Sequence, residues 1–322
     1  MSTYLHEKIF KSLTTSGFSL QNAKILLAVS GGKDSLCLLK IMKDLGKLYN
    51  WTFAIVHCNH QWRTDSYKNA HLMHTIANEF NVTFYLAINH SLLDNESKVR
   101  QWRYYILLTI AVKYKYTLIL TAHNRNDKVE TLFYNLSRGS GLEGIVALAN
   151  SKKITKNTYL YRPLLQVNQN ETSWFCRYFC LPVWSDITNL DITYKRNRIR
   201  QDLLPYLRQF FNPRLDENIL YFLDKLSLQN TYFNEYSQII YLKVIHPLYV
   251  AIHSQHYSNL HSIMQITIVR MILKQLDISS VSENSSKDLI KFLKEPNYDD
   301  CTMFFYNYIF IKKTIYVYFC KN

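Results

Sequence analysis

The sequence lacks the marks of several common protein classes. Its six cysteines include no Cys-x-x-Cys pair, and no Cys/His cluster resembles a zinc or iron–sulfur site, so cysteine-built metal sites are not predicted. No apolar run approaches the roughly 20 residues that cross a bilayer, and neither a signal-peptide core nor a low-complexity stretch is present. We therefore expect a globular protein that works in the reducing compartment where it is made.

Glycine is also scarce, and its placement is uneven. The chain has only seven glycines, of which two lie in residues 30–35 and three in residues 138–144. Because glycine lets the backbone turn sharply or approach a ligand closely, this concentration marks both segments as candidate parts of a site.

Acidic residues are outnumbered by basic ones. The chain has 38 Lys and Arg against 24 Asp and Glu, which gives a net charge of +14. This excess favours an acidic partner, and nucleic acid ahead of membrane because no strongly amphipathic basic helix stands out. The codon bias of an AT-rich genome, which enriches Lys, Ile, Asn and Tyr, is the competing explanation.

The first 150 residues alternate between two hydrophobic patterns. Strand patterns cover residues 25–29, 51–57, 82–88 and 117–122, and helical patterns cover residues 35–48, 67–80, 97–114 and 127–136. Strands separated by helices are typical of a parallel α/β sheet, whose ligands bind at the carboxyl ends of the strands. Polar residues stand at three of these ends, at Ser30, His57 and His123.

The remainder of the chain has a different pattern. Pro213 marks a plausible boundary, beyond which residues to about 293 are mostly helical. Two aromatic runs in residues 299–319 then alternate around Lys312 and Lys313 and form a candidate β-hairpin. We expect a catalytic domain over residues 1–212 and a smaller, mainly helical region over residues 213–322.

Residues 30–35 are the most informative segment. They read Ser30, Gly31, Gly32, Lys33, Asp34 and Ser35 and follow a buried strand pattern. A strand, a Gly-Gly turn and a helix start present backbone N–H groups to an anion, which predicts a phosphate-binding loop. It is not a Walker A loop, because Leu27 fills the first glycine position and Asp34 follows Lys33. A strand–turn–helix junction without a ligand is the competing interpretation.

Two further segments carry charged residues that suit catalysis or RNA binding. Asp127 and Glu130 are three residues apart at a predicted helix start, so both carboxylates lie on one face. The helix dipole alone also favours acidic residues there. A basic block follows at Lys195, Arg196, Asn197, Arg198 and Arg200. It suits RNA phosphates, although such runs are commonly a solvated surface.

The sequence of residues 30–35 resembles the PP-loop of the ATP pyrophosphatases, which cleave ATP to AMP and pyrophosphate. The ordered set of segments resembles one family of that superfamily, the tRNA(Ile)-lysidine synthetases. The matching segments are residues 30–35, 57–63, 99–104, 121–131, 138–141, 162–165 and 186–205. They cover roughly residues 24–208, and the match beyond residue 216 is poor. Asn59, Asn124 and Asn126 depart from the family pattern.

The resemblance implies an α/β fold with a parallel-sheet PP-loop domain of the adenine nucleotide alpha hydrolase-like kind. It implies an ATP-dependent ligase that joins free L-lysine to C2 of the wobble cytidine in the CAU anticodon of tRNA(Ile). The tRNA would be adenylated first, with ATP and Mg²⁺ as cofactors and no membrane partner. Together with the AT-rich codon character, the lack of a recognisable targeting peptide favours a plastid-encoded protein of the chloroplast stroma, with the bacterial cytoplasm as the alternative.

The resemblance also assigns roles to single residues. It gives all of residues 30–35 to ATP, with Asp34 as a Mg²⁺ ligand or, alternatively, a cap of the next helix. It makes Asp127 and Glu130 candidates for holding the lysine ammonium and removing its proton, since an amine of pKa about 10.4 arrives protonated.

Two cationic or titratable groups complete the candidate catalytic set. Arg100 would bind the lysine carboxylate or a phosphate, unless it is a helix-surface charge. His123 would contact the nucleotide or the adenylate, unless it is a hydrogen-bonded strand end. Candidate tRNA contacts are Arg196, Asn197, Arg198 and Arg200, with Arg138 and Arg63 as weaker ones.

Three competing functions stay open at this point. The first is a tRNA thiolase on the same fold, which would usually need the cysteine pairs that this sequence lacks. The second is an ATP-dependent synthetase acting on a small metabolite, which the basic block disfavours. The third is a non-catalytic RNA-binding relative, which the intact loop and the two carboxylates disfavour.

Overall fold

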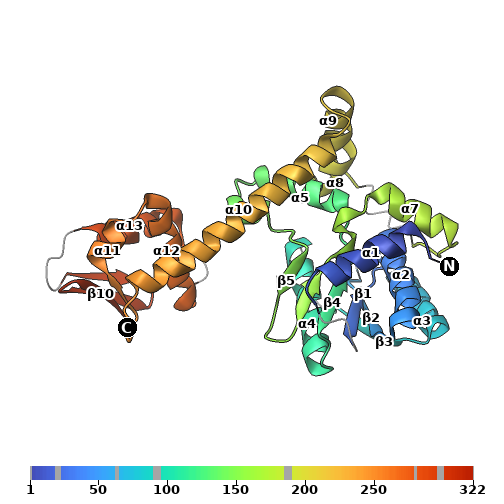
Figure 1. Cartoon of the computed structure of the whole chain (residues 1–322), viewed down its shortest axis with the longest axis horizontal. Coiled ribbons are helices and arrows are strands. Elements are labelled where there is room, and N and C mark those ends of the chain that lie inside the picture. The colour runs from blue at the N-terminus through green and yellow to red at the C-terminus, as the bar shows by residue number, and fades with distance from the viewer. Residues whose placement is uncertain are drawn as a thin grey trace. The chain divides into compact units, whose positions relative to one another are not determined.

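The computed structural model describes residues 2–18, 23–61, 65–89, 96–184, 191–278, 281–295 and 301–321. The chain forms two compact units, Met1–Leu226 and Ser227–Asn322, and the division falls within helix α10 (Leu215–Val244) (Figure 1). Arg63 and residues 186–190 lie outside the described residues. Within the described ranges, no helix combines the length and the apolarity that crossing a membrane requires.

The first unit is built on a six-stranded sheet in the order β3-β2-β1-β4-β6-β5. Its strands are β1 (Lys24–Ala28), β2 (Thr52–Asn59), β3 (Thr83–Ile88), β4 (Leu118–Thr121), β5 (Ser151–Lys153) and β6 (Tyr159–Tyr161). All neighbouring strands are parallel except β5 and β6. The parallel α/β class predicted from the sequence is confirmed.

Helices cover both faces of this sheet. They are α1 (Tyr4–Thr15), α2 (Lys33–Tyr49), α3 (Ser66–Phe80), α4 (Glu96–Lys113), α5 (Arg125–Leu136), α6 (Leu142–Ile145), α7 (Gln169–Tyr178), α8 (Lys195–Arg198) and α9 (Leu204–Phe210). Successive side chains of a strand point to opposite faces. Ile25 and Leu27 therefore pack with α1, α2, α3 and α7, whereas Leu26 packs with α4.

The strand order fixes where a ligand would bind. Strand β1 pairs with β2 on one side and with β4 on the other, so the order of the strands reverses at β1. In open parallel sheets, ligands bind at this point, outside the carboxyl ends of the strands. There β1 leads into Ser30, β2 ends at Asn59, and β4 leads into His123.

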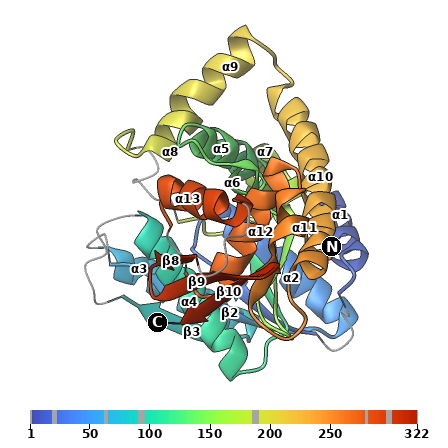
Figure 2. The ribbon, with the colours of Figure 1, turned by 90° about the vertical axis from the view of Figure 1, so that its left-hand side faces the viewer.

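The second unit combines helices with a four-stranded antiparallel sheet. Its helices beyond α10 are α11 (Ser254–Ser258), α12 (Ser262–Gln275) and α13 (Glu283–Lys294). The sheet has the order β7-β10-β9-β8, with β7 (Ala251–His253), β8 (Thr302–Phe305), β9 (Tyr308–Lys313) and β10 (Tyr316–Lys321). Figure 2 shows β8, β9 and β10 side by side.

The hairpin expected near the C-terminus is present as the β9–β10 pair, and two more strands extend it. Both tight turns place a non-glycine residue in the left-handed region, Tyr306 with φ 54° and Thr314 with φ 57°. In the first turn, Tyr306 takes this conformation, and Asn307 beside it is a residue type typical of turns. This single signal did not separate strand β8 from the longer aromatic run.

Candidate functional site

The phosphate loop lies between β1 and α2 and is held by its own hydroxyls. Gly31 has φ 91°, a conformation that glycine adopts without strain. The Ser35 hydroxyl donates to the Gly32 carbonyl at 2.8 Å, and the Ser30 N–H donates to the Ser35 hydroxyl at 3.2 Å. The loop thus closes on the N-terminus of α2, where free backbone N–H groups favour an anion.

Three other elements fix the loop from outside. The Lys33 ammonium donates to the Ser173 hydroxyl on α7 at 3.2 Å. The Trp184 N–H donates to the Gly31 carbonyl at 3.0 Å, and the Asn69 amide on α3 donates to the Ser30 carbonyl at 2.9 Å. These groups come from distant parts of the sequence, so the loop depends on the tertiary fold for its shape.

Asp34 sits in the first turn of α2 and is held by two neutral donors. The Thr172 hydroxyl donates to its Oδ1 at 2.5 Å, and the Asn124 amide donates to its Oδ2 at 2.9 Å. Burial raises the pKa of the Asp34 carboxyl, although these two donors and the Lys33 ammonium act in the opposite direction. The helix N-cap is Gly32 and not Asp34, so the carboxylate stands inside the site.

Four charged side chains form one cluster, which we call the carboxylate–arginine cluster: Asp127, Glu130, Arg196 and Arg200. Asp127 Oδ1 lies 3.2 Å from Arg196 Nη2 and 3.4 Å from Arg200 Nη2. Glu130 lies 3.1 Å from Arg196 Nε and 2.6 Å from Arg200 Nε, and only 1% of its side chain is exposed. The two carboxylates and two guanidinium groups balance in charge.

Local structure explains this geometry. Asn124 caps helix α5 and forms a reciprocal capping box with Asp127, whose Oδ2 accepts from the Asn124 N–H at 2.8 Å. This contact leaves Oδ1 of Asp127 for the arginines. Arg196 stands on α8, and Arg200 stands on a π-helical turn (Ile199–Leu203), a rare element found often at functional sites. Burial alone would lower the pKa of Arg196 and of Arg200, but the two carboxylates raise both.

Loop and cluster face one cleft made of two adjoining hollows of about 460 and 790 Å³. Residues that line both hollows are Ser30, Gly32, Cys58, His60, Arg103, His123, Asp127, Trp184 and Arg200. The larger hollow also reaches Lys33, Asp34 and Ser35, and the smaller one reaches Arg100, Arg196 and Asn197. Most residues that the sequence marked therefore meet in one place.

The larger hollow is also lined by uncharged side chains. They include Ala28, Val56, Cys58 and Leu107. An uncharged surface of this kind suits the flat face of a base, while the loop suits phosphates.

Arginines on α4 and near β6 make the floor of the cleft strongly positive. The Arg162 side chain is 5% exposed and donates to the Tyr104 hydroxyl at 3.3 Å. Burial raises the pKa of that hydroxyl, but Arg162 and Arg100 outweigh it, so the net shift is downward. Within the described part of the chain, neither Arg100 nor Arg103 has a carboxylate partner, so both guanidinium groups are available to an anion.

His123 lies at the end of β4 among these arginines. Its Nδ1 is 3.0 Å from the Thr121 hydroxyl. Burial, together with the positive charges of Arg103, Arg162 and Arg100, holds the pKa of His123 well below its ordinary value. The imidazole is neutral at physiological pH, so it can exchange hydrogen bonds with a substrate without adding charge.

We expect acid to destabilise the protein through its buried histidines. Burial lowers the pKa of His57, whose Nδ1 donates to the Val29 carbonyl at 2.8 Å. The unfolded chain binds a proton near pH 6.5 where the folded chain does not, so stability is full above that pH and falls below it. Each such histidine contributes a slope of up to about 1.4 kcal/mol per pH unit.

Denaturant unfolding at pH 7.5 and 5.5 measures this effect. The variant His57→Gln cannot titrate but can still donate to the Val29 carbonyl, so its stability should fall less between the two pH values. Equal losses in the wild type and the variant would contradict the assignment.

Some marked residues lie elsewhere. Arg138 is exposed and stacks on Tyr134, with its guanidinium carbon 5.3 Å from the ring centre. Arg198 is exposed and donates to the Ile192 carbonyl at 3.2 Å. Neither is among the residues that line the cleft.

Sequence reasoning missed several residues that shape the site: Asn69, Arg103, Thr172 and Trp184. Thr172 is 138 residues from Asp34 in the sequence, so no spacing could pair them. For Arg103, the signal was available, because it stands three residues after Arg100 on one helical face.

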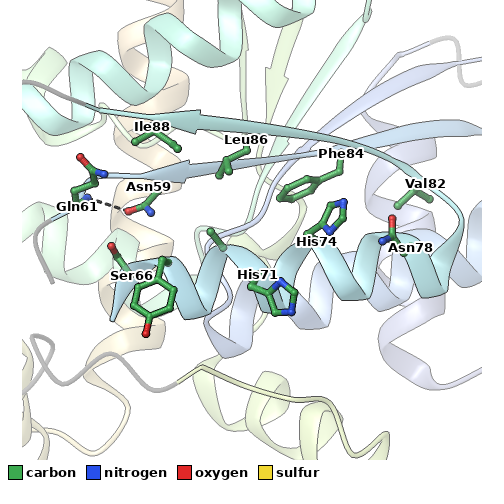
Figure 3. A pocket seen from close by; sticks show the side chains of 12 residues that line it. Asn59, Gln61, Ser66, His71, His74, Asn78, Val82, Phe84, Leu86 and Ile88 are labelled. Atoms are coloured by element: carbon green, nitrogen blue, oxygen red, sulfur yellow. Dashed lines mark hydrogen bonds between the residues drawn. The ribbon is translucent and has the colours of Figure 1, made fainter. Parts of the chain in front are cut away.

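A separate groove runs beside the cleft, between α3 and the edge strand β3, and has a volume of about 760 Å³ (Figure 3). It shares Asn59, Gln61 and Ser66 with the cleft. Figure 3 shows His74 beside Phe84, with ring centres 5.5 Å apart. Among the described residues that line it there is no Arg, Lys, Asp or Glu, whereas the described lining of the cleft includes Lys33 and several Arg that suit phosphate.

The sheet order, the loop after β1 and the cleft at the carboxyl edge define the first unit as a PP-loop domain. The PP-loop domain family model matches residues 2–207. A protein of Gracilaria tenuistipitata var. liui, named chloroplastic tRNA(Ile)-lysidine synthase, is 38% identical over 292 residues, covering 90% of this chain and 91% of the relative. A Synechocystis protein of the same name is 32% identical over 301 residues, covering 92% and 91%. The chain belongs to the tRNA(Ile)-lysidine synthase family.

Solved structures support the fold alone. The U34-tRNA thiolase NcsA of Methanococcus maripaludis, determined with its [4Fe-4S] cluster, superposes with a TM-score of 0.59 at 17% identity, covering 69% of this chain and 77% of that one. Among the described residues here, no group of three or more His, Cys, Asp or Glu is arranged to hold a metal ion.

Proposed function

We propose that the protein is an ATP-dependent ligase that joins the ε-amine of lysine to C2 of the wobble cytidine in the CAU anticodon of tRNA(Ile). The C2 carbonyl oxygen attacks the α-phosphorus of ATP and releases pyrophosphate. The amine then attacks C2, and AMP leaves with that oxygen. The observation that carries the proposal is the meeting of the phosphate loop and the carboxylate–arginine cluster in one cleft.

The phosphate loop is the proposed ATP site. Its N–H groups and Lys33 hold the phosphates, and the uncharged lining of the larger hollow receives the adenine. Mg²⁺ commonly takes one or two carboxylates with phosphate oxygens and water, and Asp34 beside the loop fits that donor set. When bound, the ion would neutralise charge on the phosphates.

The carboxylate–arginine cluster is the proposed lysine site, and its two carboxylates have different proposed roles. Asp127 lines the cleft, whereas Glu130 is buried behind Arg196 and Arg200. We therefore assign the ammonium and its proton to Asp127, and the positioning of the arginines to Glu130. Arg100 has no acidic partner among the described residues and would receive the lysine carboxylate bidentately.

The basic block has two proposed roles. Arg196 and Arg200 face the cleft, where they would meet the anticodon or the adenylate. Arg198 and Arg138 are exposed outside the cleft and would contact tRNA phosphates. Chloroplast relatives such as that of Gracilaria support a place in the plastid stroma, and the Synechocystis relative supports the bacterial cytoplasm as the alternative.

Incorporation of labelled lysine tests the proposal directly. The protein is incubated with ATP, Mg²⁺, labelled lysine and either tRNA(Ile) or tRNA(Met), both bearing a CAU anticodon. We expect label in tRNA(Ile) only. ATP consumption without lysine incorporation would overturn the assignment, and labelled sulfur entering the tRNA would point to thiolase chemistry.

A further inference from the structure

Asn69 contacts the phosphate loop at two adjacent residues, Ser30 and Gly31. It lies on α3, and its Nδ2 donates to the Ser30 carbonyl at 2.9 Å. The C=O and the next N–H of a trans peptide point in opposite directions. By holding the Ser30 carbonyl toward α3, Asn69 fixes the direction of the Gly31 N–H.

The same amide lies against Gly31 itself. A Cβ atom added to Gly31 would stand 2.3 Å from Asn69 Oδ1 and 3.2 Å from Asn69 Cγ. The Asn69 side chain thus fills the space that any other residue at position 31 would need. Gly31 is required here both by its φ of 91° and by this contact.

The side-chain oxygen of Asn69 shows that packing is not the reason for an asparagine at this position. Asn69 Oδ1 is buried and has no hydrogen-bond donor among the described residues. A buried polar atom without a partner is costly, so packing alone does not explain an asparagine here. The hydrogen bond from Asn69 Nδ2 to the Ser30 carbonyl does explain the asparagine.

We propose that Asn69 is a positioning residue of the phosphate loop, which clamps the Ser30–Gly31 peptide in the conformation that binds the phosphates of ATP. The inference rests on the proposed use of ATP at this loop. It predicts an effect on nucleotide affinity that is separate from the stability of the fold, since Asn69 is partly exposed at the cleft.

Single variants of the full chain test the clamp. Binding of a non-hydrolysable ATP analogue with Mg²⁺ is measured by titration, together with the KM for ATP and kcat of lysine incorporation. For Asn69→Ala we expect about tenfold weaker binding of the analogue, because one hydrogen bond at the loop is lost. The KM for ATP should rise, and kcat should be less affected. Asn69→Asp should lose more, because an isosteric oxygen would face the Ser30 carbonyl.

Asn78→Ala is the matched control. Asn78 is exposed on the same helix, lines the separate groove and lies outside the cleft, so analogue binding should be unchanged. Thermal unfolding of each variant without nucleotide separates a loop effect from a loss of folding.

A double-mutant cycle tests the contact itself. Gly31→Ala should weaken binding strongly in the wild type, and by a smaller factor in the Asn69→Ala background, where the colliding oxygen is gone. The inference would be overturned if Gly31→Ala weakened analogue binding by the same factor in both backgrounds. Wild-type affinity in Asn69→Asp would also overturn it. A wild-type protein that binds no ATP analogue would overturn the proposed function as well, whereas normal wild-type activity with unaffected Asn69 variants would overturn the clamp alone.

Discussion

Asp127→Asn is expected to lower the rate of lysine transfer by about 10²- to 10⁴-fold, the usual contribution of a positioned general base. The change removes one charge and keeps the side-chain shape. The amide can still accept from the Asn124 N–H, and the Asn124 side chain still accepts from the backbone N–H of residue 127, so α5 should keep its cap. The loss should fall on the step in which the amine attacks.

The two half-reactions separate this role from a general defect. tRNA-dependent exchange between ATP and pyrophosphate reports adenylation, and single-turnover lysine incorporation reports both steps. Adenylation should survive in Asp127→Asn while incorporation fails. An equal loss in both would place Asp127 in the ATP site instead. Asp224→Asn is the control, because Asp224 is 68% exposed and, in the part of the chain that the structure describes, its ion pair is with Lys128 at 2.6 Å.

Glu130→Ala is expected to cost about 3–5 kcal/mol in the free energy of unfolding, the usual result of removing one partner from a buried ion pair. Glu130 is 1% exposed and accepts from both Arg196 and Arg200. Without it, two guanidinium groups face each other over one remaining carboxylate. Denaturant unfolding of the full chain measures the loss.

Two further variants show whether the loss comes from the pairing. Glu217→Ala removes a carboxylate that is 62% exposed and lies 3.9 Å from Arg125, so it should change stability by less than about 1 kcal/mol. Combining Glu130→Met with Arg200→Met should recover part of the stability, since apolar replacement of a buried pair is often neutral. A Glu130→Ala protein as stable as the wild type would show that the cluster does not hold α5 and α8 together.

The cluster also shows where sequence reasoning stopped. All four residues were identified from the sequence, but as two separate sites. Asp127 and Glu130 were assigned to lysine, and Arg196 and Arg200 to tRNA. Folding places each of the two carboxylates within 3.4 Å of both guanidinium groups. The pairing depends on a π-helical turn and on a capping box, which no residue spacing between distant segments reveals.

The fold was largely predictable because its signals are local. Strand and helical patterns located β1 to β4 and α2 to α5, and the glycines of residues 30–35 located the loop. The second unit was less predictable, since the turn at Tyr306 adopts φ 54° without glycine. The division of the chain at residue 212 and the individual site roles stay predictions.

By itself, the sequence determined the parallel α/β class, the phosphate loop after the first strand and the family to which the chain belongs. These follow from short-range patterns: apolar periodicity, glycine placement and an ordered set of motifs. Only the tertiary structure decided that Thr172 and Asn124 hold Asp34, that Asn69 clamps the loop, and that Glu130 is buried while Asp127 faces the cleft. Those contacts join side chains from separate elements, and their distances exist only once the helices pack on the sheet.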